Sequence, residues 1–232
     1  MKDQIKVIAF DADDTLWINE PFFTEGEEKF CQLMAEFMPF DDAHKELFAR
    51  EIGNLPLYGY GIKAFMLSMT ETALKISEGQ LSSEQLNQIL QIGRDMLNKP
   101  VDLIDGVEEV LRSLSGRYRL VGATKGDLLD QERKFEKSGL AHYFEHIEIF
   151  SEKTPDKYLK LSNLLKIAPE EFLMIGNSLK SDILPVLEIG GYGIHVPFHT
   201  TWEHERVDGE VKHERFMKFD KISELLLSLI HI

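Results

Sequence analysis

The sequence predicts an α/β protein in which a doubly wound parallel sheet carries an inserted α-helical bundle. Three observations predict this fold class. Residues 5–10 are rich in β-branched side chains and apolar on both faces, which is typical of a strand buried inside a parallel sheet. Helical patterns then occupy residues 22–97. After residue 100, short apolar segments alternate with amphipathic ones, which indicates right-handed strand–helix–strand units.

The composition is that of a globular protein with a hydrophobic core. The chain has 232 residues, of which 43% are hydrophobic and 28% are charged. Lys and Arg total 26 against 40 Asp and Glu, a formal net charge of −14, which argues against nucleic acid as the main partner because binding to its backbone needs clustered positive charge. No stretch reaches the roughly 18 apolar residues that a membrane span needs, so no membrane partner is expected.

The expected location is cytoplasmic. Lys6 and Asp11 interrupt the first apolar run, so it does not have the pattern of a signal peptide. Cys31 is the only cysteine, which excludes an intrachain disulfide and a multi-cysteine metal site.

The helical segment is expected to form a bundle of about four helices. Thr24 with Glu27 and Ser82 with Gln85 have the spacing of capping boxes, so each pair is expected to begin a helix. Two further helices are expected, one from residue 41 or 42 toward residue 52 and one over residues 62–76.

The second half of the chain is expected to complete the sheet. Asp105 is expected to cap a helix through residue 114, and Gly139 to end a helix that starts at residue 127. Strands are expected over residues 118–123, 146–150, 172–175, 191–196 and 216–219. Helices are expected over residues 155–165, 181–189 and, as a final docking helix, 221–229.

The predicted domains are a catalytic core, residues 1–19 and 99–232, and a helical cap inserted into it, residues 20–98. The insertion follows the carboxyl end of the first strand. Ligands of open parallel sheets bind at that end. We therefore expect the bundle to cover a ligand site as a cap.

The candidate functional residues come directly after predicted strands. Asp11 and Asp13 follow the first strand, Thr124 the second, Lys153 the third and Asn177 the fourth. Because parallel strands end at a common edge of the sheet, these side chains are expected to gather there. Their shared placement is stronger evidence than any one of them alone.

The oxygen-bearing members suit a hard cation. Asp11, Asp13 and Asp182, with Asn177, offer the ligand atoms that Mg²⁺ prefers, and Mg²⁺ takes few protein ligands. Asp11 ends a buried strand, where an unpaired carboxylate is costly. The residues around Asp13 could instead form an ordinary solvated turn.

Two further positions suit an anion. The Thr124 hydroxyl and the backbone N–H groups that follow it could cradle an anion, although a threonine there could simply cap a helix. Lys153 lies in a polar stretch before a helix, which taken alone indicates an exposed lysine.

Residues 10–16, Phe-Asp-Ala-Asp-Asp-Thr-Leu, resemble the first signature of the haloacid dehalogenase-like (HAD) superfamily. Three more motifs follow in order: residues 120–124, Lys153 in Lys-Thr-Pro-Asp-Lys-Tyr, and residues 175–182, Ile-Gly-Asn-Ser-Leu-Lys-Ser-Asp. The similarity spans about residues 6–196 and implies a Rossmann-like HAD core. The insert resembles the α-helical, C1-type cap of this superfamily.

The resemblance implies a catalytic role for three residues. Asp11 would be the nucleophile that forms an aspartyl-phosphate. Asp13 would be the general acid for the leaving alcohol and then the general base for water. Lys153 would orient Asp11 and neutralise phosphate charge.

The resemblance also implies the binding residues. Thr124 and the N–H of Lys125 would hold phosphate oxygens. Magnesium would be held by the carboxylate of Asp11, the main-chain carbonyl of Asp13 and either Asn177 or Asp182.

Three positions qualify the resemblance. Position 177 is Asn where many members carry Asp, which removes one negative charge from the expected metal site. Asp14 stands where Gly is common, so the local backbone is expected to differ slightly. Asp13 favours phosphoryl transfer, because dehalogenating members do not use an acid–base aspartate at that position.

The leading hypothesis is a magnesium-dependent phosphatase that hydrolyses a small phosphorylated metabolite, a phosphate monoester. The alternatives are a phosphomutase or phosphonate-cleaving relative on the same scaffold, and a non-catalytic binding or regulatory protein. In the cap, Tyr58, Tyr60 and Lys63 could form a specificity loop or an ordinary helix–helix turn. His195, His199 and His204 are expected to be core or surface histidines rather than zinc ligands, because their spacing fits no compact zinc pattern.

Overall fold

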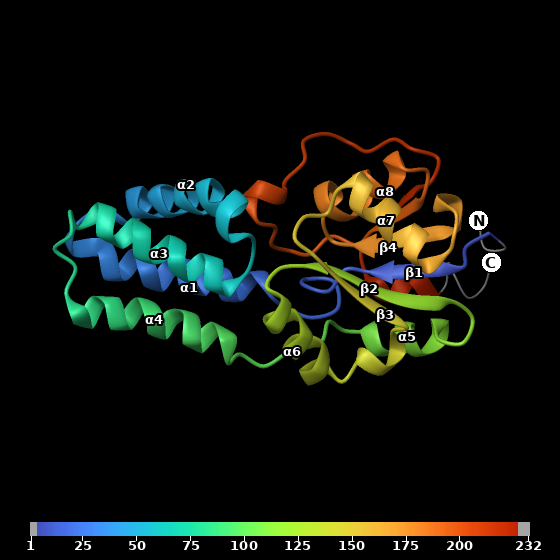
Figure 1. Ribbon diagram of the computed structural model, residues 1–232, viewed down its shortest axis with the longest axis horizontal. Coiled ribbons are helices and arrows are strands. Elements are labelled where there is room, and N and C mark those ends of the chain that lie inside the picture. The colour runs from blue at the N-terminus through green and yellow to red at the C-terminus, as the bar shows by residue number, and fades with distance from the viewer. Residues whose placement is uncertain (1–3, 227–232) are drawn as a thin grey trace. The chain divides into compact units, whose positions relative to one another are not determined.

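A computed structural model describes residues 4–226, which divide into two compact units (Figure 1). The sheet unit comprises residues 4–20, 101–125 and 131–226 of the described chain, and the helical unit comprises residues 21–100 and 126–130.

The sheet unit is built on a parallel sheet, which confirms the predicted α/β class. The described residues form six strands in the order β3-β2-β1-β4-β5-β6, and every neighbouring pair is parallel. At the end of β1, Phe10 pairs with Gly122 of β2 and Ile175 of β4, so the residues that follow these three strands share one edge. The strands are β1 (Val7–Phe10), β2 (Arg119–Lys125), β3 (His146–Phe150), β4 (Phe172–Gly176), β5 (Tyr192–His195) and β6 (Phe216–Lys218).

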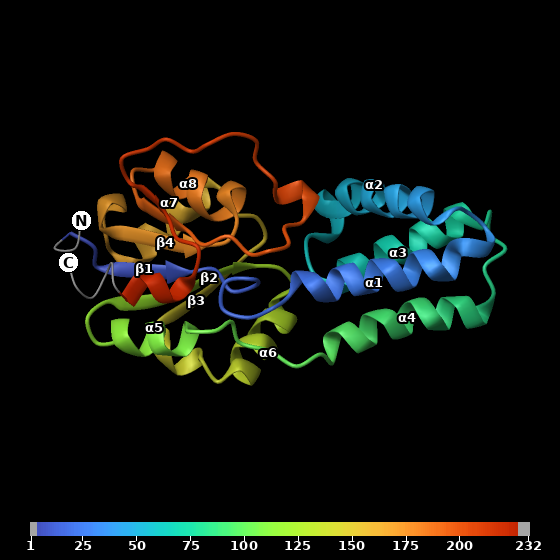
Figure 2. The same ribbon diagram turned by 180° about the vertical axis from the view of Figure 1, so that it is seen from behind.

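Helices cover both faces of this sheet, as Figures 1 and 2 show from opposite sides. Ile8 and Phe10 pack in one core with α5 (Val107–Leu114) and Phe135 of α6 (Leu128–Ser138). Val7 and Ala9 pack in the other core, with α7 (Pro155–Leu165) and α8 (Leu184–Glu188). Alternate residues of β1 therefore face opposite cores, which explains why the strand is apolar throughout.

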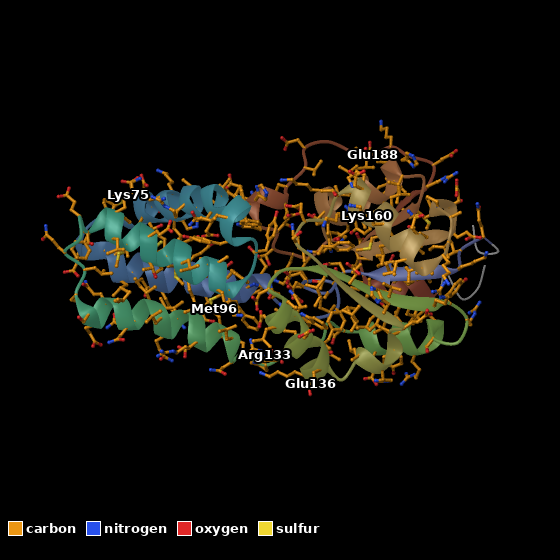
Figure 3. All side chains as sticks on the ribbon, in the orientation of Figure 1. Lys75, Met96, Arg133, Glu136, Lys160 and Glu188 are labelled. Atoms are coloured by element: carbon orange, nitrogen blue, oxygen red, sulfur yellow. The ribbon has the colours of Figure 1, made fainter. Side chains whose placement is uncertain are left out.

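The outer surfaces of the covering helices are polar. Glu136, Lys160 and Glu188, labelled in Figure 3, are exposed on α6, α7 and α8 respectively. The sheet faces are thus shielded by helices that are apolar toward the sheet and charged toward water.

The helical unit has its own hydrophobic core. The helices are α1 (Glu20–Leu33), α2 (Phe40–Tyr58), α3 (Ile62–Ile76) and α4 (Ser83–Leu97). Phe30, Leu47, Phe65 and Ile89 contribute one large side chain from each helix to that core. The capping box of Ser82 and Gln85 is confirmed: the Ser82 hydroxyl accepts the Gln85 N–H, and the Gln85 side chain accepts the Ser82 N–H. No helix of the described residues is both long enough and apolar enough to cross a membrane.

The predicted capping box at Thr24 and Glu27 is wrong. Helix α1 begins earlier, at Glu20, so Thr24 lies inside it. The carboxylate of Asp14 accepts the N–H groups of Asn19 and Glu20, at 2.9 and 3.0 Å. A cap supplied from outside the helix replaces the local one, because the first N–H groups of a helix need an acceptor from any source.

Other boundaries also differ from expectation: helix α2, for example, runs to Tyr58 instead of ending near residue 52. Gly106, with φ of 86°, precedes α5 in place of the expected cap Asp105. The helix expected over residues 181–189 starts as a π-helical turn, Leu179–Ile183, before α8. The segment expected to be a docking helix, residues 221–229, begins with a 3₁₀ turn at Ile222–Glu224 and is α-helical at residues 225–226; the remainder lies outside the described residues.

Candidate active site

Asp11 is a buried carboxylate at the end of the central strand β1. Its side chain bonds in two directions. Oδ1 lies 2.5 Å from Nζ of Lys153, and Oδ2 lies 3.2 Å from the hydroxyl of Thr15. That hydroxyl also lies 3.3 Å from Oδ1 of Asn177 and accepts the Asn177 N–H. One hydroxyl thus brings a carboxylate oxygen and an amide oxygen to the same small region.

Lys153 joins Asp11 to Asp182. Its ammonium lies 2.5 Å from Oδ1 of Asp11 and 2.6 Å from Oδ1 of Asp182, and all three side chains are buried. Burial and the neighbouring Asp182 raise the pKa of Asp11 to about 7, although Lys153 opposes the rise. Burial alone would lower the pKa of Lys153, but Asp11 and Asp182 together raise it well above its usual value. Lys153 is therefore charged at neutral pH.

Asp182 is fixed by its second oxygen. Oδ2 accepts the N–H of Ser178 at 3.0 Å, while Oδ1 faces Lys153. The carboxylate lies so close to Gly176 that a Cβ at that position would overlap it. A glycine at the end of β4 is therefore what allows Asp182 to reach Lys153.

Asp13 has a separate set of partners. Lys134 approaches both of its carboxylate oxygens, at 2.6 and 2.8 Å. Trp17 donates to Oδ1 at 2.7 Å, and Gln131 donates to Oδ2 at 2.8 Å. Burial works against the charge, yet Lys134, Gln131 and Trp17 hold the pKa of Asp13 below its usual value.

Lys125 was expected to act through its main-chain N–H, and its side chain has partners of its own. Its ammonium lies 2.5 Å from Glu205 and 2.9 Å from the Ser181 hydroxyl. Thr124, which was expected to follow a strand, is the buried sixth residue of β2, two residues beyond Gly122, the partner of Phe10.

The structure thus brings most of the predicted site residues to one edge of the sheet. Hydrogen bonds connect Asp11, Lys153, Asp182 and Asn177 directly or through Thr15. Asp13 and Lys125 lie at the same edge, but their side chains bond to partners other than Asp11 and Lys153. Gln131 links the two, because it donates to both the Asp13 carboxylate and the Lys125 carbonyl.

The residues fit a divalent cation. Asp11 and Asp182 face one ammonium, Lys153, so this buried cluster carries one excess negative charge whenever both carboxylates are ionised. No three His, Cys, Asp or Glu side chains in residues 4–226 gather into a metal-binding group. An ion here would therefore use one or two protein side chains with carbonyl, water or phosphate oxygens, which is the habit of Mg²⁺.

Sequence reasoning missed Gln131, Lys134 and Glu205. Gln131 and Lys134 are three residues apart and so share one face of α6, a spacing that predicts a joint contact but not its target. Glu205 lies in a long connection after β5, where no local pattern signals a role. Its contacts reach residues up to 80 positions away.

Comparisons with known proteins found a matching family model and similar solved structures. The family model described as haloacid dehalogenase-like hydrolase matches residues 5–190. The structure of a haloacid dehalogenase-like family hydrolase from Xanthomonas campestris is 36% identical, covers 98% of this chain and 91% of its own, and superposes with a TM-score of 0.88. A HAD-hydrolase from Bacillus subtilis, described as bound to magnesium, shares the fold at a TM-score of 0.64 and 18% identity, over 97% of this chain and 99% of its own.

Curated relatives match over shorter segments. N-acylneuraminate-9-phosphatase from Mus musculus is 31% identical over 93 residues, 38% of this chain and 38% of the relative. The Homo sapiens protein of the same name is 24% identical over 139 residues, 57% of this chain and 56% of the relative. The match therefore spans no more than about half the length of either relative.

Proposed function

The chain belongs to the haloacid dehalogenase-like hydrolase family, and we propose that it is a magnesium-dependent phosphatase of a small phosphate monoester. One observation carries the proposal. The Asp11 carboxylate is buried at the end of the central strand, held by Lys153 on one oxygen and by Thr15 on the other. A fixed, buried carboxylate beside a charged lysine suits nucleophilic attack on an anionic phosphoryl group.

In the proposed first step, an oxygen of Asp11 bonds to phosphorus as the bond from phosphorus to the leaving oxygen breaks. Despite burial, Lys134, Gln131 and Trp17 lower the pKa of Asp13 in the free protein, but a bound phosphate brings negative charge beside Asp13 and so favours its protonated form. Protonated Asp13 then gives its proton to the leaving oxygen, so the product leaves as an alcohol. The enzyme then carries an aspartyl-phosphate at Asp11.

In the proposed second step, the Asp13 carboxylate takes a proton from water as the water oxygen bonds to phosphorus. The bond between phosphorus and Asp11 breaks, and inorganic phosphate leaves. Asp11 is regenerated as a carboxylate and Asp13 as an acid, so the cycle can repeat.

Other residues are proposed to bind rather than react. Thr124 and the N–H of Lys125 hold phosphate oxygens, and Lys153 keeps Asp11 in place. Magnesium is proposed to bind to the carboxylate of Asp11, the carbonyl of Asp13 and the side chain of Asn177, where it would offset charge between nucleophile and phosphate. Asp182 is proposed to hold Lys153, because its Oδ1 faces the Lys153 ammonium while its Oδ2 is fixed by the Ser178 N–H.

The helical unit is proposed to act as a cap, since it is inserted between β1 and β2, directly after the proposed nucleophile. A cytoplasmic location is proposed too. A single free, buried cysteine, Cys31, suits a reducing compartment.

The test is a panel of phosphate monoesters, including N-acylneuraminate 9-phosphate, assayed for released phosphate. We expect turnover that EDTA abolishes and added Mg²⁺ restores. Asp11→Asn should lower the rate at least about a thousandfold, with Asp41→Asn, at an exposed position of α2, as the matched control.

Other products would contradict the proposal. An isomerised sugar phosphate formed without free phosphate would indicate a phosphomutase. Cleavage of a phosphonate in preference to all esters would indicate the phosphonate-cleaving alternative. Binding of phosphate esters without turnover, at any divalent cation concentration, would indicate a non-catalytic protein.

A further inference from the structure

We infer that Lys134, with Gln131 and Trp17, positions the carboxylate of Asp13 for both proton transfers of the reaction. The inference rests on the proposed function, since it assigns three new residues to the proposed acid–base group. None of the three belongs to the four motifs noted in the sequence.

The contacts form a complete cradle for one carboxylate. Oδ1 faces Lys134 at 2.6 Å and Trp17 at 2.7 Å. Oδ2 faces Lys134 and Gln131, each at 2.8 Å. Each carboxylate oxygen of Asp13 accepts two hydrogen bonds. Rotation of the side chain would break several of them at once, so one orientation is strongly favoured.

Each donor is itself held in place. Trp17 is fully buried, and its ring meets that of Phe135 edge-on at 5.0 Å. Gln131 is buried and donates its second amide hydrogen to the Lys125 carbonyl at 3.1 Å. Lys134 lies 3.3 Å from the Asn19 side-chain oxygen, and its side chain is only 15% exposed. The cradle is therefore preorganised by the fold.

The hydrogen-bond partners of Asp13 differ from those of Asp11, which fits different roles for the two carboxylates. The two oxygens of Asp11 bond to Lys153 and Thr15, whereas those of Asp13 bond to the cradle. The side chain of Asp13 is thus committed to the cradle and is not offered as a metal ligand. Asp13 can still exchange a proton with the leaving oxygen or with water, and the rate of such a transfer depends steeply on geometry.

The test compares Lys134→Met with Lys137→Met, an exposed lysine on the same helix. Two substrates are used with Mg²⁺: p-nitrophenyl phosphate, whose leaving group departs without a proton, and an alkyl phosphate that the wild type hydrolyses. For Lys134→Met we expect kcat on the alkyl phosphate to fall about a hundredfold with KM nearly unchanged. Lys137→Met should stay within about twofold of wild type on both.

The aryl substrate should behave differently, because its first step does not need the acid. Rapid mixing of Lys134→Met with p-nitrophenyl phosphate should release about one equivalent of nitrophenolate per enzyme at nearly the wild-type rate. Slow turnover should follow, since hydrolysis of the aspartyl-phosphate needs the base. Lys134→Arg, which keeps a cation within reach of Asp13, should recover at least about tenfold of the lost alkyl phosphate activity.

A general structural role predicts another result. Equal losses on both substrates without a burst, a rise in KM alone, or full activity of Lys134→Met would overturn the inference. If Lys134→Met does not fold, Gln131→Met replaces it, with the same pattern expected at about a tenfold loss. Wild-type protein inactive on all phosphate esters would overturn the proposed function and this inference together, whereas active wild type with uniform losses overturns the inference alone.

Discussion

The carboxylate of Glu205 lies 2.5 Å from the ammonium of Lys125, although 80 residues separate them in the chain. The same carboxylate accepts hydrogen bonds from Ser178 at 2.5 Å and Ser181 at 2.7 Å. One side chain therefore ties the connection after β5 to the end of β2 and to the π-helical turn after β4. Each of its partners is adjacent in sequence to a predicted site residue.

Glu205 should stabilise the fold in a pH-dependent way. Burial would raise the pKa of Glu205, but Lys125 and the two serine hydroxyls lower it to about 2. A carboxyl group whose pKa is lower in the folded than in the unfolded chain stabilises the fold at a pH above its unfolded pKa, which is 4.5 here. This stabilisation is lost as the pH falls toward the folded pKa of about 2. The shift corresponds to stabilisation on the order of 3 kcal/mol.

The measurement is urea unfolding of wild type and Glu205→Gln between pH 7 and pH 3. The difference in unfolding free energy between the two should be constant above about pH 5 and shrink steadily below it. Glu136→Gln, exposed on α6, serves as the control. A difference between wild type and Glu205→Gln that does not change over this range would contradict the assignment.

Gly176→Ala and Gly53→Ala should have opposite effects on stability. A Cβ at position 176 would overlap the Asp182 carboxylate, so the substitution should cost at least about 1–3 kcal/mol and displace a partner of Lys153. A Cβ at Gly53, an exposed position in α2, meets nothing within 4 Å and should stabilise the helix by about 0.5–1 kcal/mol. Thermal unfolding of both variants checks the signs, and a harmless Gly176→Ala would refute the close approach.

Asp11→Asn should lose activity without losing stability. Asparagine keeps the size of Asp11 and an acceptor oxygen, but it removes one of two buried carboxylates that share Lys153. Since burial and Asp182 already disfavour the charged form of Asp11, we expect the unfolding free energy at pH 7.5 to stay equal or rise by about 1 kcal/mol or more. A clear loss of stability would mean that the Lys153–Asp11 contact stabilises the fold more than burial of the charge destabilises it.

The fold was largely predictable because its signals are local. Hydrophobic periodicity predicts the alternation of strands and helices after residue 100, and β3 and α7 have the predicted bounds. The meeting of Asp11, Lys153 and Asp182 followed from their shared place after parallel strands. Helix starts were predicted less well. Helix α1 begins before Thr24, because the carboxylate of Asp14, five and six residues before the N–H groups that it accepts, supplies the cap.

Contacts of the site that cross long stretches of chain were not predictable in this way. Lys134 reaches Asp13 across 121 residues and Glu205 reaches Lys125 across 80, and no periodicity in either segment signals the partner. The direction of the Lys125 side chain was equally unpredictable from the sequence. Motif spacing placed its N–H at the sheet edge, whereas the fold of a remote connection decided where its ammonium lies.

Asp14 allows a ranked test of how α1 begins. Its φ of 60° is left-handed, and its carboxylate caps the helix through Asn19 and Glu20. Asp14→Ala loses the cap and keeps an unfavourable φ, so it should cost about 2–4 kcal/mol.

Asp14→Gly also loses the cap, but glycine accepts this φ, so its cost should be about 1–2 kcal/mol. Asp14→Asn keeps an acceptor and tolerates this φ. Because burial raises the pKa of Asp14 to about 7, a neutral side chain there avoids the cost of a buried charge. Urea unfolding at pH 7.5 should therefore rank the variants Asn, Gly, Ala from most to least stable. If alanine proved as stable as asparagine, the helix would be capped by water or by another group.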